Sequence, residues 1–402
     1  MQSSHLPDSH TFKKRRVAFL EPHLDMATNP SLVCLIRALR RCGAQVDVFM
    51  PFSRNFPSLD NAFSRYPFPS SPLLWYGDVT STFRNWYGHF RFRPQGIKRL
   101  LTPGYYDLIL GIDSAGVIQG YEIARKSNVP LVYLSFEIFF HNELRNLSEL
   151  KEKEIETQAS QFADLIIIQD ESRARLLATE NNLPLNRFAY LALSPEGPAE
   201  TKRSDFLRGR FGISSKQTIV LHSGSFAPWT CAEEILDSVN SWPLDFVLVI
   251  HTQYRNRPNR KFSRAKHKIP NVIFSSEPLP IEDYNEMLAS ADIGLSLYKS
   301  FPGSRYTQKN VETIGLSSGK FAFYMKYGLP VVSIKQQMYA RLLQDYHFGE
   351  NIDTFSELPS ALSRLKLNFC YHRSEAVRLF SERLDFNVHW PKLAERFLQV
   401  MR

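Results

Sequence analysis

Cysteine and long apolar runs are scarce in this sequence of 402 residues, and acidic residues are fewer than basic ones. Its four cysteines are scattered, with no Cys-x-x-Cys pair and no histidine at metal-ligand spacing: Cys34, Cys42, Cys231 and Cys370. This scarcity argues against a disulfide framework or a zinc site, and it favours reduced thiols in a cytosolic protein. No run of about eighteen apolar residues occurs, which argues against a transmembrane helix. The N-terminal residues lack an apolar segment with a small-residue cleavage site, so we expect no secretory signal.

Acidic residues are outnumbered, with 40 Asp and Glu against 49 Lys and Arg and a formal net charge of +9. A basic balance of this size indicates an anionic partner. Nucleic acid, nucleotide phosphates and an anionic membrane surface all fit it, so the charge alone selects none of them.

The sequence does contain a regular alternation of short apolar runs and amphipathic stretches. In the first half, strands are predicted at 15–20, 44–50, 106–112, 130–135 and 164–169, and helices at 29–43, 115–127, 143–162 and 171–181. Near-continuous apolar strands separated by helices are typical of a parallel sheet covered on both faces. The first helix has the clearest limits, with Asn29 as cap, Pro30 at its first position and Gly43 as its stop.

The alternation begins again after residues 194–216, a polar segment rich in Pro and Gly. Five more strands are predicted at 217–224, 244–251, 271–276, 291–298 and 329–334, and two closing helices lie within 374–400. We therefore expect an α/β protein with two doubly wound, Rossmann-like domains, at 1–200 and 201–375, and returning C-terminal helices at 376–402. Ligands of such sheets bind beyond the carboxyl ends of the strands, so a cleft between the domains is the expected site.

The stretch GLSSGKFAFYMKYGLPVV, residues 315–332, has the features of an anion site at a helix start. Ser318 is a suitable N-cap, Gly319 lets a ligand approach the backbone, and Lys320 adds positive charge to the free N–H groups of the first turn. Gly328 then ends the helix before a buried strand. An ordinary capped helix has the same residues, so phosphate binding and simple capping both stay open.

A second candidate is LHSGSFAPW, residues 221–229. A predicted strand ends at His222, and Ser223, Gly224 and Ser225 form a tight turn at its carboxyl end. Backbone N–H groups of such a turn can contact a pyrophosphate. A plain strand-to-helix turn explains the segment equally well.

The second half of the chain resembles the nucleotide-binding domain of GT-B glycosyltransferases, most nearly glycosyltransferase family 4. The resemblance rests on LHSGS, on PIEDYNEMLASADIGLSLY (280–298) and on GLSSGKFAFYMKYGLPVV. In the first half it rests on the topology and on QFADLIIIQDESRARLL (161–177), and the closing helices resemble the family's helix that crosses back to the N-domain. The resemblance implies a sugar transferase that uses a UDP- or GDP-linked donor and no separate cofactor.

Two departures from the family pattern concern the donor. The family places a pair of Glu eight positions apart, but this chain has Gly315 and Phe323 there, so the carboxylate that holds the nucleotide ribose is missing. Glu312 is the nearest substitute. The family's Arg and Lys after the first strand of this domain are also missing, and other basic residues must hold the diphosphate. The expected donor-binding residues are Gly224, Ser225, Arg305, Lys309, Glu312, Ser317, Ser318, Gly319 and Lys320.

Catalytic candidates lie beyond two strands of the first domain. Glu137 and His141 follow the strand at 130–135, and His23 and Asp25 follow the first strand. Any of the four could act as a base toward an acceptor hydroxyl, although solvated loop residues have the same appearance. An inverting enzyme needs one of them as a base, whereas a retaining enzyme, which the family 4 resemblance implies, mainly needs them for positioning. Glu137 is the preferred base, because an apolar setting directly after a strand raises the pKa of a carboxyl. GT-B enzymes need no bound divalent metal, and the sequence has no Asp-x-Asp motif, so we expect no metal.

Residues 73–101 interleave aromatic and basic side chains, which suits an anionic membrane surface with a lipid-linked acceptor, single-stranded nucleic acid, or an inward-folded insertion. We expect a cytoplasmic glycosyltransferase, peripheral at the inner face of a membrane, acting in polysaccharide or glycolipid biosynthesis on a saccharide or lipid-linked acceptor, without nucleic acid. Two alternatives remain. One is a sugar-nucleotide epimerase of the same fold, and the other is a non-catalytic partner protein.

Overall fold

A computed structural model describes residues 7–22, 29–50, 64–67, 94–252, 269, 271–302 and 305–402. By their contacts the residues of the chain form two units. Unit 1 is Met1–Glu196 with Phe386–Arg402, and unit 2 is Gly197–Asp385. Residues 376–385 therefore belong to unit 2, and the chain returns to unit 1 at Phe386.

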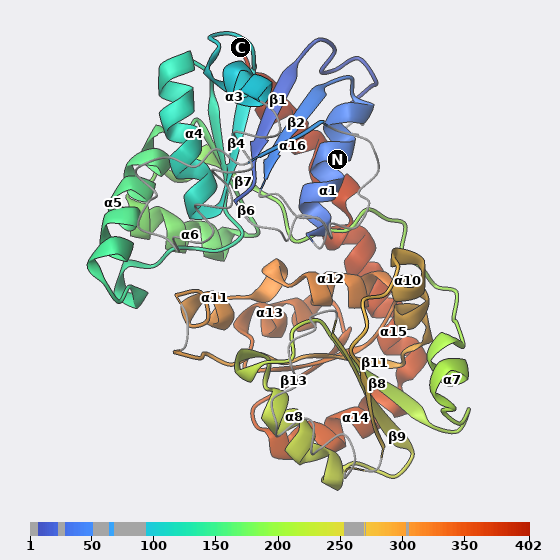
Figure 1. The fold of residues 1–402 in the computed structure, drawn as a ribbon. Helices are drawn as coiled ribbons and strands as arrows, with labels where there is room; N and C mark the ends of the chain where they lie inside the picture. Colours follow the sequence, from blue (N-terminus) through green and yellow to red (C-terminus); the bar gives the residue numbers. More distant parts are fainter. Residues whose placement is uncertain are drawn as a thin grey trace. The chain divides into compact units, whose positions relative to one another are not determined.

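The described residues of unit 1 form a parallel sheet of seven strands in the order β3-β2-β1-β4-β5-β6-β7 (Figure 1). In chain order its strands are β1 Arg16–Leu20, β2 Gln45–Met50, β3 Ser64–Pro67, β4 Leu108–Ile112, β5 Leu131–Leu134, β6 Leu165–Ile168 and β7 Phe188–Tyr190. Its α-helices are α1 Pro30–Arg41, α3 Pro94–Leu101, α4 Asp113–Ser127, α5 Leu147–Phe162, α6 Glu171–Asn181 and α16 Phe386–Val400. The sequence predicted five of these strands; β3 and β7, the two edge strands, were missed.

Buried side chains cover both faces of the unit 1 sheet. Helices α1 and α16 contribute Leu35, Trp390 and Phe397 to one core, while α4 and α6 contribute Val117 and Leu177 to the other. Burial on both faces explains why the strands read as continuous apolar runs rather than as alternating ones. The predicted limits of α1 are confirmed, because the side chain of Asn29 accepts from the Leu32 N–H at 3.1 Å and Gly43 has a φ of +93°.

Helix α4 packs against the sheet at backbone distance. A Cβ added to Gly111 of β4 would lie 2.5 Å from the Gly116 carbonyl oxygen, and one added to Gly116 would lie 2.6 Å from that of Leu20. Only glycine permits this approach. The first residues of α4 are thereby held at the carboxyl ends of β1 and β4.

Unit 2 is a parallel sheet of six strands in the order β10-β9-β8-β11-β12-β13 (Figure 1). In chain order its strands are β8 Thr218–Ser223, β9 Phe246–His251, β10 Val272–Ser275, β11 Ile293–Ser296, β12 Val331–Ile334 and β13 Gly349–Ile352. Its α-helices are α7 Phe206–Phe211, α8 Ala232–Ser238, α10 Ile281–Ser290, α11 Lys309–Glu312, α12 Gly319–Lys326, α13 Gln337–Asp345, α14 Leu358–Leu367 and α15 Phe369–Leu379. Five strands were predicted, and the edge strand β13 was missed. None of the helices in the described residues is long and apolar enough to cross a membrane.

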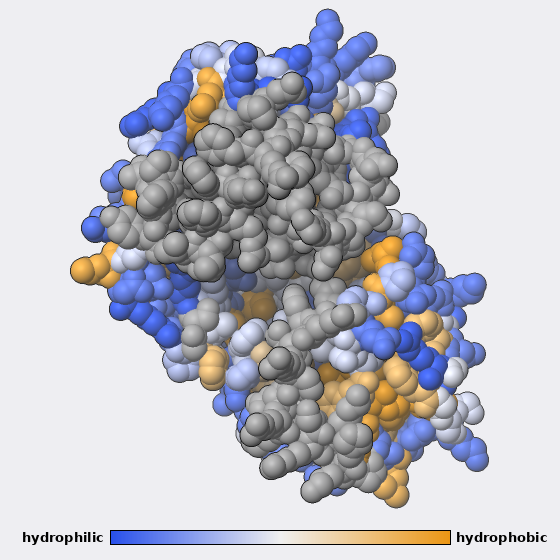
Figure 2. Space-filling view, viewed as in Figure 1, coloured by the Kyte–Doolittle hydropathy of each residue, from blue (hydrophilic) through white to orange (hydrophobic). Residues whose placement is uncertain are grey.

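Basic residues gather at the amino ends of the unit 1 strands. Lys13 precedes β1, while Arg40, Arg41 and Lys98 close α1 and α3, and all four are exposed. The upper edge of this unit is correspondingly hydrophilic in Figure 2. Cations at helix C-termini interact favourably with the helix dipole, which accounts for this part of the net charge without a ligand.

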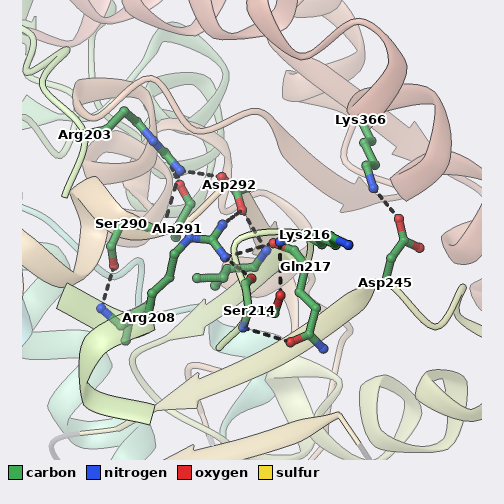
Figure 3. Close-up of polar contacts among 12 residues, drawn as sticks. Arg203, Arg208, Ser214, Lys216, Gln217, Asp245, Ser290, Ala291, Asp292 and Lys366 are labelled. Atoms are coloured by element: carbon green, nitrogen blue, oxygen red, sulfur yellow. Dashed lines mark hydrogen bonds and ion pairs between the residues drawn. The ribbon is translucent and has the colours of Figure 1, made fainter. Parts of the chain in front are cut away.

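The start of unit 2 is fixed by one carboxylate, shown in Figure 3. Asp292, just before β11, pairs with the guanidinium groups of Arg203 and Arg208 and accepts the Ile219 N–H at 2.8 Å. Arg203 also donates to the Ala291 carbonyl oxygen. Through Asp292, the segment that contains Arg203 and Arg208 is thus connected to β8 and β11, the two central strands of the sheet.

Replacing Asp292 with Asn is expected to lower the free energy of unfolding by about 1–3 kcal/mol, because two guanidinium groups lose their charged partner. The midpoint of urea unfolding measures this loss. The matched control is Asp245→Asn, which removes the exposed pair with Lys366 that Figure 3 also shows and should cost about 0.5 kcal/mol or less. Equal losses in the two variants would contradict the structural role of Asp292.

Candidate functional site

The strand order of unit 2 reverses between β8 and β11, its two central strands. From β8 the chain runs outward to β9 and β10, and it then returns to begin β11 on the other side of β8. Helices leave such neighbouring strands in opposite directions, and the crevice outside their carboxyl ends is where open α/β sheets bind ligands. In this unit His222 and Ser223 end β8, and Tyr298 follows β11.

The first turn of α12 begins beside this point. Ser318 is the N-cap, and its hydroxyl accepts from the Phe321 N–H at 3.2 Å and contacts the Tyr298 hydroxyl at 2.7 Å. The N–H groups of Gly319 and Lys320 have no acceptor among the described residues. Helix starts with free N–H groups attract anions through those groups and through the helix dipole.

Lys320 adds a cation to the same turn. Its ammonium lies 4.7 Å from the centre of the Tyr298 ring, and its side chain is half-buried. Desolvation lowers the pKa of Lys320 to about 7, and burial raises the pKa of Tyr298 to about 12. An anion placed here would relieve the cost of the poorly solvated ammonium, so the site favours negative charge.

His222, near the carboxyl end of β8, is fully buried. Its Nε2 lies 3.0 Å from the Ser225 carbonyl oxygen, which can only accept, so Nε2 carries the proton. Burial, followed by the charge of Lys320, lowers the pKa of His222 well below its usual value. The imidazole is therefore neutral, and Lys320, with its pKa of about 7, is the member of this pair that carries positive charge at and below neutral pH.

Tyr324 fixes α12 against β8. Its hydroxyl donates to the Leu221 carbonyl oxygen at 3.1 Å and accepts from the Ser223 N–H at 2.9 Å. The ring lies so close to β11 that a Cβ on Gly294 would approach it to 2.4 Å. These contacts hold the start of α12 in one position relative to the strand ends.

The structure brings Ser318, Gly319 and Lys320 together with the turn after β8. In that turn the Gly224 N–H donates to the His251 carbonyl oxygen at 3.0 Å, and the Ser225 carbonyl oxygen accepts from Thr230. Gly224 has a φ of +99° and open space where a Cβ would stand, so it leaves room above the strand end. Its own N–H is already used by the sheet.

The remaining predicted donor residues lie just before α12. The Ser317 hydroxyl donates to the Ile314 carbonyl oxygen at 2.5 Å. Arg305 stacks its guanidinium over Tyr306 at 5.1 Å, Lys309 begins α11, and Glu312 ends it with an exposed side chain. Whether these residues hold a nucleotide remains a prediction.

In unit 1, Glu137 follows β5 as predicted. Its N–H and that of Phe136 donate to Asp113 Oδ1 at 3.0 and 2.7 Å, and Asp113 begins α4 with a φ of +51°. Burial raises the pKa of Glu137 to about 7; the charge of the buried Arg173 lowers it, and that of Asp113 raises it. A half-buried carboxyl that titrates near neutrality has the properties of a general acid or base.

The other catalytic candidates differ from Glu137. His141 begins a short 3-10 helix, is exposed, and donates its N–H to Glu180 Oε1 at 2.7 Å. His23 and Asp25 lie outside the described residues.

Sequence reasoning missed three residues that shape these sites: Tyr298, Asp113 and Arg173. Tyr298 directly follows a predicted strand, which was an available signal. Arg173 is fully buried and donates to the Phe136 carbonyl oxygen at 2.8 Å, but nothing in its helix pattern distinguishes it from a surface arginine.

No protein-family model matches the sequence, and no curated protein does so either. Solved structures do match over nearly the whole chain. HepE (Alr3699) of Anabaena, in complex with UDP-glucose, has a TM-score of 0.70 at 15% identity, covering 96% of this chain and 99% of that one. The chain has the GT-B fold.

Two other structures support this assignment. Sucrose-phosphate synthase from Thermosynechococcus elongatus has a TM-score of 0.67 at 11% identity, with 96% and 99% of the two chains covered. WaaG, a glycosyltransferase of lipopolysaccharide biosynthesis, has a TM-score of 0.60 at 16% identity, with 94% and 98% covered. The structure confirms the two predicted Rossmann-like sheets and the predicted return of the C-terminal helix, α16, to unit 1.

Proposed function

We propose that this protein is a nucleotide-sugar-dependent glycosyltransferase. The observation that carries the proposal is the first turn of α12, where two free N–H groups and the ammonium of Lys320 stand at the switch point of the unit 2 sheet. A leaving nucleoside diphosphate needs such a seat, because its negative charge increases as the glycosidic bond breaks. Several matched structures with the same fold contain UDP or UDP-glucose, which supports a nucleotide-sugar donor.

The proposed contacts with the sugar-nucleotide donor follow from the N–H groups of α12 that have no acceptor in the described part of the chain. The diphosphate is bound by the N–H groups of Gly319 and Lys320 and by the Lys320 ammonium, above the room left by Gly224. Arg305 and Lys309 assist from the preceding segment. The charge on the leaving group is met by these groups without a bound metal or a separate cofactor, and the donor is UDP- or GDP-linked.

The acceptor side belongs to unit 1. Glu137 takes the proton of an acceptor hydroxyl as that oxygen forms the new glycosidic bond. The acceptor is a saccharide or a lipid-linked saccharide, and the protein is cytoplasmic. The basic and aromatic segment 73–101 contacts an anionic membrane surface; residues 73–93 lie outside the described residues, while α3 carries exposed Leu101 beside exposed Lys98.

Thermal-shift screening of the full chain against UDP, GDP, ADP, CMP and their sugars tests the function. One nucleotide diphosphate should raise the unfolding temperature, since a ligand at a hundred times its Kd adds about 2.7 kcal/mol of stability. Product analysis with the stabilising sugar nucleotide then separates transfer from epimerisation. A flat response to every nucleotide would favour a non-catalytic protein.

A further inference from the structure

A row of three aromatic side chains runs from α12 to the end of β9. The rings of Phe323 and Tyr284 stand edge-to-face at 5.9 Å, and Tyr284 lies 6.1 Å from the ring of His251. Phe323 and Tyr284 are half-buried, whereas His251 is buried and contacts the Ser275 hydroxyl at 3.0 Å. The rings of Phe323 and Tyr284 therefore form a partly open face that packs against the buried His251 imidazole.

This row adjoins the diphosphate seat, that is, Gly319 and Lys320 in the first turn of α12. Phe323 is three residues after Lys320, so the two side chains lie on the same face of α12, one turn apart. Three residues of a helix rise about 4.5 Å, which is the scale of one phosphate-to-ribose step. A nucleoside whose phosphate is bound at Lys320 thus reaches the aromatic row with its ribose and base. Aromatic side chains contact sugars and bases through their apolar faces and edges.

Within the part of the chain that the structure describes, no Asp or Glu belongs to this aromatic row. Rossmann-type sites use an Asp or Glu to bind the ribose hydroxyl. On α10, the acidic neighbours Glu282, Asp283 and Glu286 are one or two residues from Tyr284 and so lie off its face. Between β9 and Glu277 the sequence has no Asp or Glu, since residues 252–276 hold seven Arg and Lys residues and none that is acidic.

We propose that the nucleoside is held by aromatic contact and that its 2′-hydroxyl is not recognised. The site then binds 2′-deoxyribonucleoside diphosphates, thymidine diphosphate among them, as well as ribonucleoside diphosphates. This inference rests on the proposed function, and Phe323 is its specificity-determining residue.

Calorimetric titration of the full chain with matched pairs, UDP against 2′-deoxy-UDP and GDP against 2′-deoxy-GDP, tests the proposal. The expected Kd values within the pair that binds agree within about three-fold, because a lost charge-assisted hydrogen bond would cost about ten-fold. A preference for the ribonucleotide of ten-fold or more would overturn it. The variant Glu312→Gln should leave unchanged the ratio of the Kd of the deoxyribonucleotide to that of the ribonucleotide. A fall of this ratio in the variant would mean that Glu312 binds the 2′-hydroxyl.

The variant Phe323→Glu places a carboxylate beside the ribose and should create a preference for the ribonucleotide of about ten-fold. The ratio is the measured quantity, because repulsion between the new carboxylate and the diphosphate weakens both ligands alike. In the matched control Phe323→Leu, both ligands should weaken and the ratio should stay near one. Unchanged affinity for both ligands in Phe323→Leu would overturn the aromatic contact.

The proposed function and this inference fail in different ways. If no nucleotide diphosphate binds, the function fails and the inference fails with it. If a ribonucleotide binds and its deoxy partner does not, the function stands and only the inference is lost. If Phe323→Glu does not fold, the inference is still tested by the ratio of the two Kd values in the native protein and in Glu312→Gln.

Discussion

Replacing Lys320 with Ala is expected to weaken binding of the nucleotide diphosphate by about ten- to a hundred-fold, since a hydrogen bond to a charged group is worth about 1.5–3 kcal/mol. The ammonium belongs to the first turn of α12, which also has the two free N–H groups, and its neighbour His222 is neutral. Most of the nucleotide-induced thermal shift should disappear. Calorimetry with the stabilising nucleotide gives the affinity directly.

A second variant at this position, Lys320→Met, separates binding from stability. Desolvation lowers the pKa of Lys320 to about 7, so at pH 7 the folded protein bears a cost for this side chain that the unfolded chain lacks. Lys320→Met should therefore raise the free energy of unfolding by about 1 kcal/mol while binding is lost. The control is Lys326→Ala at the far end of α12, which should keep the affinity. An unchanged thermal shift in Lys320→Ala would remove the diphosphate from this turn.

Much of the fold and the limits of α12 could be predicted from local features of the sequence. Ser318 was identified as an N-cap and Gly328 as a helix stop, and the structure confirms both, because capping depends on residues that are neighbours in the sequence. The parallel sheets were predictable for the same reason, since a strand buried on both faces is a continuous apolar run.

Edge strands and buried ionic residues could not be predicted in this way. Strands β3, β7 and β13 have only three or four residues each, and β13, Gly349–Ile352, is only partly buried, so its apolar pattern is weak. Arg173 reaches Phe136 across 37 positions of sequence, and Asp113 reaches Glu137 across 24. Such contacts depend on the order of the strands, which single-residue patterns do not contain. The raised pKa of Glu137 was predicted only because burial alone suffices to raise it.

Glu137→Gln is expected to lower the rate of sugar transfer by about a hundred- to ten-thousand-fold, the usual contribution of a positioned general base. The amide keeps the size of the side chain and its backbone hydrogen bond to Asp113 but cannot accept a proton. The affinity for the nucleotide should stay unchanged, because Glu137 belongs to unit 1 and the diphosphate seat to unit 2. The control is Glu171→Gln, an exposed carboxylate of α6, which should keep full activity.

The pH profile gives the sharper test. A base works only when deprotonated, and the pKa of Glu137 is about 7, so kcat/KM should rise about ten-fold per pH unit as the pH increases toward 7. If Lys320 is a phosphate ligand it acts only when protonated, so its pKa of about 7 gives kcat/KM an opposite, alkaline limb and a maximum near pH 7. In the profile of kcat a bound diphosphate should shift this alkaline limb upward. Residual activity of Glu137→Gln should lose the acidic limb and keep the alkaline one. If the acidic limb persists in that variant, the base is another residue. The raised pKa of Glu137 would then reflect only its burial in the loop after β5.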